Sequence, residues 1–348
     1  MFDIFHDAPF TKAFVIAALA TAITGCGGGS SSSSDSSGPQ VSPIPAQEDE
    51  ASTAGQIDVA DYGSGVMDEA ALESIVTESY RILTEIAWSN TRYVELIDVV
   101  AESDLGEEIA RDAIDLSAFL CPGGGQGTLS FDNGRPREAE DGFLVFSAGD
   151  RFTLAYNSCE FSGYEDPLMQ EGSATTTVEA GFHDAFGEFV SLNGTVSTVY
   201  NAVGLRNGNE TLSYRNGDIR RGIENGSDVF IKGSSLKVQT PTQPALAFAL
   251  QDYELQLIET GDSSIVREWT MSAPSSFGLG IGETGEIYQA RLDNVVLSES
   301  ASWLTAGSYT LLTDSRTLEI TIENGFLNYQ ADLDGDGSSD IAASVAQP

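Results

Sequence analysis

Period-two alternation of apolar and polar residues dominates the chain from Gly125 onward. Asn-Gly pairs interrupt this alternation six times, starting at Asn133, Asn193, Asn207, Asn216, Asn225 and Asn324. Asn-Gly tolerates the positive φ angles of two-residue turns, so it is typical of strands that are joined as hairpins. The pattern therefore predicts an antiparallel meander over residues 121–331.

Alternating segments of this region predict individual strands with one buried face. We expect them at Gly127–Phe131, Arg151–Tyr156, Ala174–Ala180, Glu188–Val199, Asp228–Val238, Leu246–Ile258, Val266–Ser272, Glu286–Ser298 and Ser308–Ala331. The apolar residues before and after Gln251 lie in opposite phase, which predicts a β-bulge there.

Helical spacing replaces the alternation between Asp68 and Leu120. Two apolar stripes recur at intervals of three and four residues: Leu72, Ile75, Val76, Leu83, Ile86 and Ala87, then Leu105, Ile109, Ala113, Leu116 and Leu120. Asp68 and Asp104 precede the stripes as candidate caps. The fold class that we predict is α+β, with two N-terminal amphipathic helices packed on a large curved antiparallel β-sheet.

An apolar run from Ala13 to Thr24 stands near the N-terminus and ends in Gly25-Cys26. It is shorter than the roughly 20 residues that span a bilayer as a helix, which favours a signal peptide. Small residues before a cysteine make the stretch from Lys12 to Cys26 resemble the lipobox of bacterial lipoproteins. The resemblance implies cleavage before Cys26 and a lipid, including palmitate, attached to its thiol. An ordinary cleaved signal with a chance cysteine is the alternative.

The segment after Cys26 contains almost no large apolar side chains, and its Gly27–Gly38 portion is built only of glycine, serine and one aspartate. Such a chain behaves as a flexible tether with a reach on the order of 30 Å. Gly27 stands where an aspartate usually signals inner-membrane retention, so the resemblance implies an outer-membrane lipoprotein. The expected organisation is signal peptide 1–25, tether 26–58, helical segment 59–120, β domain 121–331 and an Asp-rich loop and tail 332–348.

The net charge of −37 limits the possible partners. Such a surface repels nucleic acid and anionic lipid headgroups, so we expect no nucleic-acid binding and membrane contact through the lipid anchor. An acidic surface that keeps the protein soluble in salt is the plainer interpretation. Attraction of calcium or of cationic partners is the more specific one.

Two cysteines remain besides Cys26, namely Cys121 and Cys159. In a chain expected to face an oxidising compartment, a disulfide is favoured over a metal site or two separate thiols.

The strongest local motif runs from Asp332 to Asp340, with the sequence DLDGDGSSD. Its carboxylates, its glycine at the sixth position and the carbonyl of the seventh residue match a calcium loop of EF-hand type. The predicted ligands are Asp332, Asp334, Asp336, Ser338 and Asp340. Ala343 replaces the usual bidentate glutamate, so binding should be weak, with a dissociation constant of about 10⁻⁴ to 10⁻³ M. A solvated Asp-Gly tail is the alternative.

Other candidate sites have weaker support. The Gly280–Gly285 segment fits GxGxxG but precedes an alternating segment instead of the helix that a dinucleotide site needs. His183 is the one histidine after Cys26, which excludes sites that require two. Trp269 and Trp303 could form a sugar-binding platform, although packing in the core is favoured.

Three functions are compatible with these features. We favour a non-catalytic envelope lipoprotein that binds or presents an unidentified protein or glycan at the outer membrane. A lipid or client carrier would need an apolar cavity between sheet and helices. A carboxylate-dependent hydrolase would need two converging, desolvated acids.

Overall fold

The computed structural model describes residues 62–91, 113–134, 137–138, 144–161, 168–180, 182–185, 188–189, 194–208, 210–224, 228–240, 245–260, 267–282, 285–298, 300–301 and 303–348. All of them belong to one compact unit. Cys26, the lipobox and the tether lie outside the described residues.

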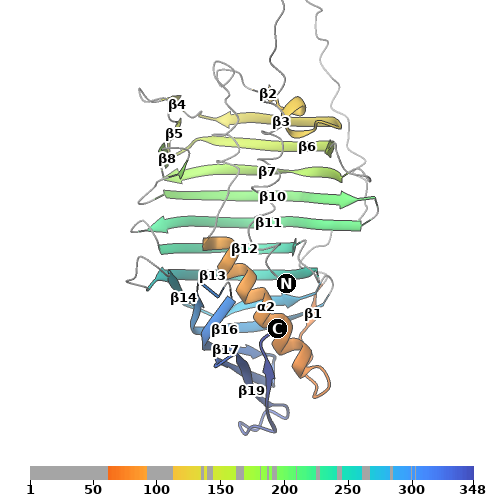
Figure 1. Cartoon of the computed structure of the whole chain (residues 1–348), viewed down its shortest axis with the longest axis vertical. Helices are drawn as coiled ribbons and strands as arrows, with labels where there is room; N and C mark the ends of the chain where they lie inside the picture. Colours follow the sequence, from red (N-terminus) through yellow and green to blue (C-terminus); the bar gives the residue numbers. More distant parts are fainter. Residues whose placement is uncertain are drawn as a thin grey trace, which may run out of the picture. The chain divides into compact units, whose positions relative to one another are not determined.

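One 16-stranded sheet contains most of the strands (Figure 1). Its path is β2 (Ala113–Asp115), β3 (Gly124–Asn133), β6 (Arg151–Phe161), β7 (Leu168–Ala180), β10 (Gly194–Asn207), β11 (Glu210–Glu224), β12 (Asp228–Thr240), β13 (Leu246–Glu259), β14 (Glu268–Ser272), β16 (Glu286–Ser298), β17 (Trp303–Leu312), β18 (Thr317–Glu323), β19 (Phe326–Asp332) and β20 (Ile341–Ala346). Neighbours along this path pair antiparallel and follow chain order, which confirms the antiparallel meander.

Six further strands complete the described β structure. Two of them join the large sheet beside the main path: β1 (Gly63–Ser64) pairs parallel with β16, and β15 (Phe277–Ile281) pairs with β13 and β16. The small sheet contains β4 (Arg137–Glu138), β5 (Leu144–Phe146), β8 (Phe182–Ala185) and β9 (Glu188–Phe189).

The predicted α+β class with two N-terminal helices on the sheet is wrong. The first stripe does form a long helix, α2 (Leu72–Thr91), and the Asp68 carboxylate accepts a hydrogen bond from the Ala71 amide at 2.9 Å. The described part of the second stripe is instead the short strand β2 and the four-residue helix α4 (Ser117–Leu120). The protein is therefore predominantly antiparallel β.

The end of the second apolar stripe is compatible with a strand as well as with a helix, because Ile114 and Leu116 are apolar residues two positions apart. Ile114 is buried between the exposed Ala113 and Asp115, as in a half-buried strand, and it lies opposite Leu129 of β3. Pairing with β3 supplies the backbone hydrogen bonds that a helix would have formed internally. Tertiary pairing overrode the local helical spacing here.

Two clusters of buried apolar side chains stabilise the sheet. We call the first the helix core: it joins one face of α2 to inward residues of β12 to β19. We call the second the disulfide core, and its members are Ile114, Leu116, Leu120, Cys121, Leu129, Phe131, Phe146, Phe152, Leu154, Cys159, Val178 and Val196. Figure 1 shows α2 crossing the strands of the C-terminal half.

Contacts distant in sequence hold α2 inside the curved half of the sheet. Leu72, Val76 and Leu83 are almost fully buried. The Tyr80 hydroxyl donates to the Leu304 carbonyl at 2.9 Å, and the Tyr309 hydroxyl lies 2.9 Å from Ser79 Oγ. The concave side of the β12 to β19 strands is thus filled by the helix. None of the described helices is both long and apolar enough to cross a membrane.

Candidate metal centre

The Asp332–Asp340 loop connects β19 to β20, which together form a hairpin. β20 pairs with β19 from Ile341 opposite Ala331 to Ala346 opposite Phe326. The chain after the loop is therefore a strand and not a solvated tail. Because β19 leads into the loop and β20 follows it, both ends of the loop are held in the sheet.

Backbone amides within the loop orient its carboxylates. Asp332 accepts from the amides of Gly335 at 2.7 Å and Gly337 at 2.8 Å, one with each carboxylate oxygen. Asp340 accepts from the Leu333 amide at 2.7 Å. Gly335 and Gly337 have φ angles of 76° and 88°, a conformation that glycine adopts without strain.

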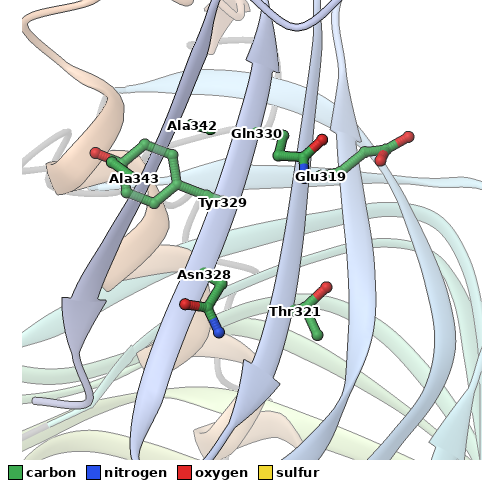
Figure 2. Close-up of a pocket in the computed structure, with 7 residues that line it drawn as sticks. All are labelled: Glu319, Thr321, Asn328, Tyr329, Gln330, Ala342 and Ala343. Carbon is green, nitrogen blue, oxygen red and sulfur yellow. The ribbon is translucent and has the colours of Figure 1, made fainter.

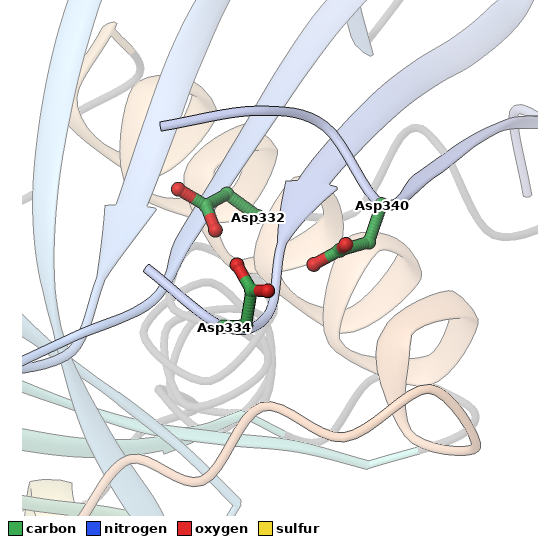
Figure 3. Close-up of side chains that lie close together, drawn as sticks. All are labelled: Asp332, Asp334 and Asp340. Atoms are coloured by element: carbon green, nitrogen blue, oxygen red, sulfur yellow. The ribbon is translucent and has the colours of Figure 1, made fainter. Parts of the chain in front are cut away.

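Three carboxylates converge in this loop (Figure 3). One oxygen from each of Asp332, Asp334 and Asp340 lies within 4.8 Å of the other two. Calcium binds oxygen at about 2.3 to 2.6 Å, so oxygens up to about 5 Å apart can share one ion. The donor set and its spacing fit a calcium ion, and the partly exposed position would leave room for water ligands.

The other two predicted ligands do not belong to this convergent group. Asp336 accepts a hydrogen bond from the Ser338 amide at 2.7 Å, and Ser338 could offer only its carbonyl or hydroxyl oxygen. Ala343, at the position of the usual bidentate glutamate, lies in β20 opposite Tyr329. The loop therefore brings together three of the five predicted ligands.

A hollow lies on strand β18 and on the two strands of this hairpin, β19 and β20 (Figure 2). Its volume is about 210 Å³, below the roughly 300 Å³ of small ligand sites. It is lined by Glu319, Thr321, Asn328, Tyr329, Gln330, Ala342 and Ala343. Sequence reasoning missed the hollow because it depends on β20, whose short apolar residues were assigned to a tail.

The predicted disulfide is present in the structure. Cys121, directly after α4, is bonded to Cys159 of β6, with 4.8 Å between their Cα atoms. The bridge therefore joins the end of α4 to β6.

The weaker candidates do not form a site in the described part of the chain. Gly280 lies in β15, and β16 follows the glycine-rich segment, so no helix opens where a dinucleotide would need one. Trp269 is 7% exposed and packs in the helix core, whereas Trp303 is 47% exposed. A platform built from both tryptophans is therefore excluded.

Comparisons with protein-family models, with characterised proteins and with solved structures found no match.

Proposed function

We propose that the chain is a non-catalytic lipoprotein of a bacterial outer membrane, which binds or presents a protein or glycan partner through the outer surface of its sheet. The observation that supports this best is the position of α2. The helix fills the concave side of β12 to β19, where Val76, Ile82 and Leu83 are completely buried. A partner would therefore bind to the solvent-exposed outer surface of the sheet.

The filled concave side argues against a lipid or client carrier. A carrier needs an apolar cavity for its cargo, and the side chains of α2 occupy that space in the curved half of the sheet. Opening it would expose residues such as Leu72 and Ile86. The free-energy cost would be about 1.5 to 3 kcal/mol for each large apolar side chain.

A hydrolase has equally little support from the acidic loop. Asp334 and Asp340 are exposed and Asp332 is half-buried, whereas acid catalysis by a carboxyl needs an environment that excludes water. The converging carboxylates suit a cation better.

The lipid anchor is tested by metabolic labelling with radioactive palmitate. The wild type should be labelled and should fractionate with the outer membrane, because the Cys26 thiol accepts the lipid. Cys26→Ser should be unlabelled, while Cys121→Ser should retain the label. A wild-type protein that is unlabelled and soluble in the periplasm would contradict the proposal.

We propose further that the Asp332–Asp340 loop binds calcium weakly and that the ion stabilises the β19–β20 hairpin. The ion would be held by Asp332, Asp334 and Asp340, with water or the Ser338 carbonyl completing its shell. Three carboxylates within 4.8 Å repel one another, and a divalent cation reverses that repulsion. At one hundred times the dissociation constant, linkage predicts about 2.7 kcal/mol of added stability.

Thermal melting in calcium and in magnesium tests this site. Calcium should raise the melting temperature of the wild type, and the Asp334→Ala/Asp336→Ala variant should lose that increase. Asp293→Ala/Asp314→Ala, which removes two exposed acids outside the loop, should retain it. Equal melting temperatures in calcium and magnesium would show that the loop is only polar, and an increase that survives in the first variant would place the site elsewhere.

A further inference from the structure

The strand β20 forms one edge of the large sheet. It pairs with β19 along one side, and among the described strands none lies along its other side. Ala342, Ala343, Ser344 and Ala346 are all exposed to solvent. A row of backbone donors and acceptors is therefore available to another extended chain.

The register identifies which backbone groups face the open side. The Gln347 amide donates to the Gly325 carbonyl at 3.0 Å, so these opposite residues form a hydrogen-bonded pair. Such pairs alternate along an antiparallel ladder, and β19 and β20 pair without a register shift. Ile341, Ala343 and Val345 thus bond to β19, and the N–H and C=O groups of Ala342, Ser344 and Ala346 point outward.

For an exposed edge strand of an acidic protein, β20 has an unusual composition. Residues 341–348 contain no charged side chain, although the whole protein has a net charge of −37. Proteins commonly block an exposed edge with charges, with proline inside the strand or by keeping the strand very short. Among the described strands the opposite edge is β2, which follows that practice because it has only three residues and one of them is the exposed Asp115.

We propose that β20 pairs antiparallel with β20 of a second copy of this chain, about a two-fold axis that passes beside Ser344. The outward residues are self-complementary in this arrangement, since Ala342 meets Ala346 of the second copy and Ser344 meets Ser344. Three such pairs supply about six backbone hydrogen bonds. The facing side chains are only alanine and serine, so they introduce neither steric conflict nor charge repulsion.

The antiparallel arrangement also separates the two acidic loops. Asp340 of one copy would lie beside residue 348 of the other, so the two Asp340 residues are about 27 Å apart at 3.4 Å per residue. That distance exceeds the Debye length of about 8 Å at physiological ionic strength. Repulsion between the loops is therefore screened, and the uncharged strand lies between them.

Proline at the centre of the strand tests the pairing. Two differently tagged copies of the full chain are co-expressed and purified in detergent, one tag is captured, and the amount of the other is measured. Ser344→Pro removes an outward N–H and leaves the ladder to β19 intact, so it should reduce co-capture at least tenfold. Ser344→Ala keeps the N–H and should match the wild type, and both variants should show the wild-type circular dichroism spectrum.

A charge exchange tests the position of the two-fold axis. Ser344→Lys copies should not capture each other, nor should Ser344→Glu copies, because like charges would lie directly opposite. Lys and Glu copies expressed together should recover co-capture, since the two side chains then form an ion pair. The proposal would be overturned if wild-type copies did not capture each other, or if Ser344→Pro left their co-capture unchanged. Pairing of β20 with a strand of a different protein would give no co-capture between wild-type copies.

Discussion

The helix core and the disulfide core stabilise the same sheet in different ways. The curved C-terminal strands wrap around α2 and bury a large apolar cluster against it. The strands from β2 to β10 share a smaller cluster, which is closed by α4, Phe146 of β5 and the Cys121–Cys159 bridge. The difference indicates that the strands over which no long described helix packs have another source of stability, which here is covalent.

The largest expected effect comes from a cavity in the helix core. Leu83→Ala removes a side chain that is completely buried between α2 and the sheet, and it should lower the free energy of unfolding by about 4 kcal/mol. Glu73→Ala, on the exposed face of the same helix, should change it by less than about 0.5 kcal/mol. Urea denaturation measures both. Similar values for the two variants would mean that α2 does not fill the core.

Removal of the bridge should affect the disulfide core selectively. Cys121→Ala/Cys159→Ala opens a loop with a sequence separation of 38 and should cost about 3.9 kcal/mol in the chain-entropy model. In this variant, amide hydrogen exchange should accelerate more in β3 and β6 than in β17 and β18. Uniform acceleration over both groups of strands would show that the two cores unfold as one cooperative unit.

A buried threonine pair on β7 and β10, two strands of the disulfide core, should have an intermediate effect. Thr176 of β7 and Thr198 of β10 are buried, and their hydroxyl oxygens lie 3.0 Å apart. Thr176→Val leaves the Thr198 hydroxyl without this partner and should cost about 1 to 2 kcal/mol. The double variant Thr176→Val/Thr198→Val should recover most of that loss. Urea midpoints of the wild type, of Thr176→Val, of Thr198→Val and of the double variant complete a double-mutant cycle, and purely additive losses would exclude coupling.

Ionisation of Tyr80 alone should weaken the helix core at alkaline pH by the smallest of these amounts. Burial raises the pKa of Tyr80 to about 12. Below pH 10 the phenol is protonated in both the folded and the unfolded chain. Above pH 10 only the unfolded chain ionises, so stability falls as pH rises towards 12. The loss from this one group is about 1 kcal/mol at pH 11.

Tyr80→Phe is the corresponding test. This variant should lose less stability than the wild type between pH 9 and pH 11, as measured by the urea midpoint. Burial also raises the pKa values of Tyr253, Tyr288 and Tyr309, which belong to the same core, so part of the alkaline loss should persist. An identical pH dependence in both proteins would exclude a contribution from Tyr80.

Much of the sheet could be predicted from alternation, and its exceptions have physical causes. The phase change predicted in β13 is present, because the buried side chains change from even to odd positions between Leu250 and Tyr253, where Asp252 has a φ of 47°. The β-bulge expected there is wrong with respect to β12, because Gly233 pairs with Tyr253 and Ser235 with Gln251 in one unchanged register. None of the predicted strands covers β11, because the Asn216-Gly217 pair inside it is typical of a hairpin turn. Gly217 has a φ of 117°, and a Cβ there would lie 2.0 Å from the Ser235 carbonyl oxygen. The glycine permits a close approach of two strands rather than a hairpin.

The loop and the strand after it differ in how far the sequence predicted them. The convergence of Asp332, Asp334 and Asp340 could be predicted because the spacing of the three carboxylates is a local property of nine residues. β20 could not, since Ala342, Ala343 and Ser344 have little strand preference of their own and become a strand by pairing with β19. Asn324-Gly325, in contrast, forms the predicted turn, with φ angles of 54° and 79°.

The enclosure of α2 imposes an order on the biogenesis of the protein. Ser79 and Tyr309, which are 230 residues apart, lie 2.9 Å from each other. The ribosome synthesises α2 before the strands that cover it. The apolar face of α2 therefore cannot be buried in its native contacts until most of the chain has been synthesised. Closing so long a loop makes folding slow and leaves the nascent helix exposed to aggregation. A holding chaperone that binds the segment around Leu72–Leu83 would cover this apolar face until the C-terminal strands are available.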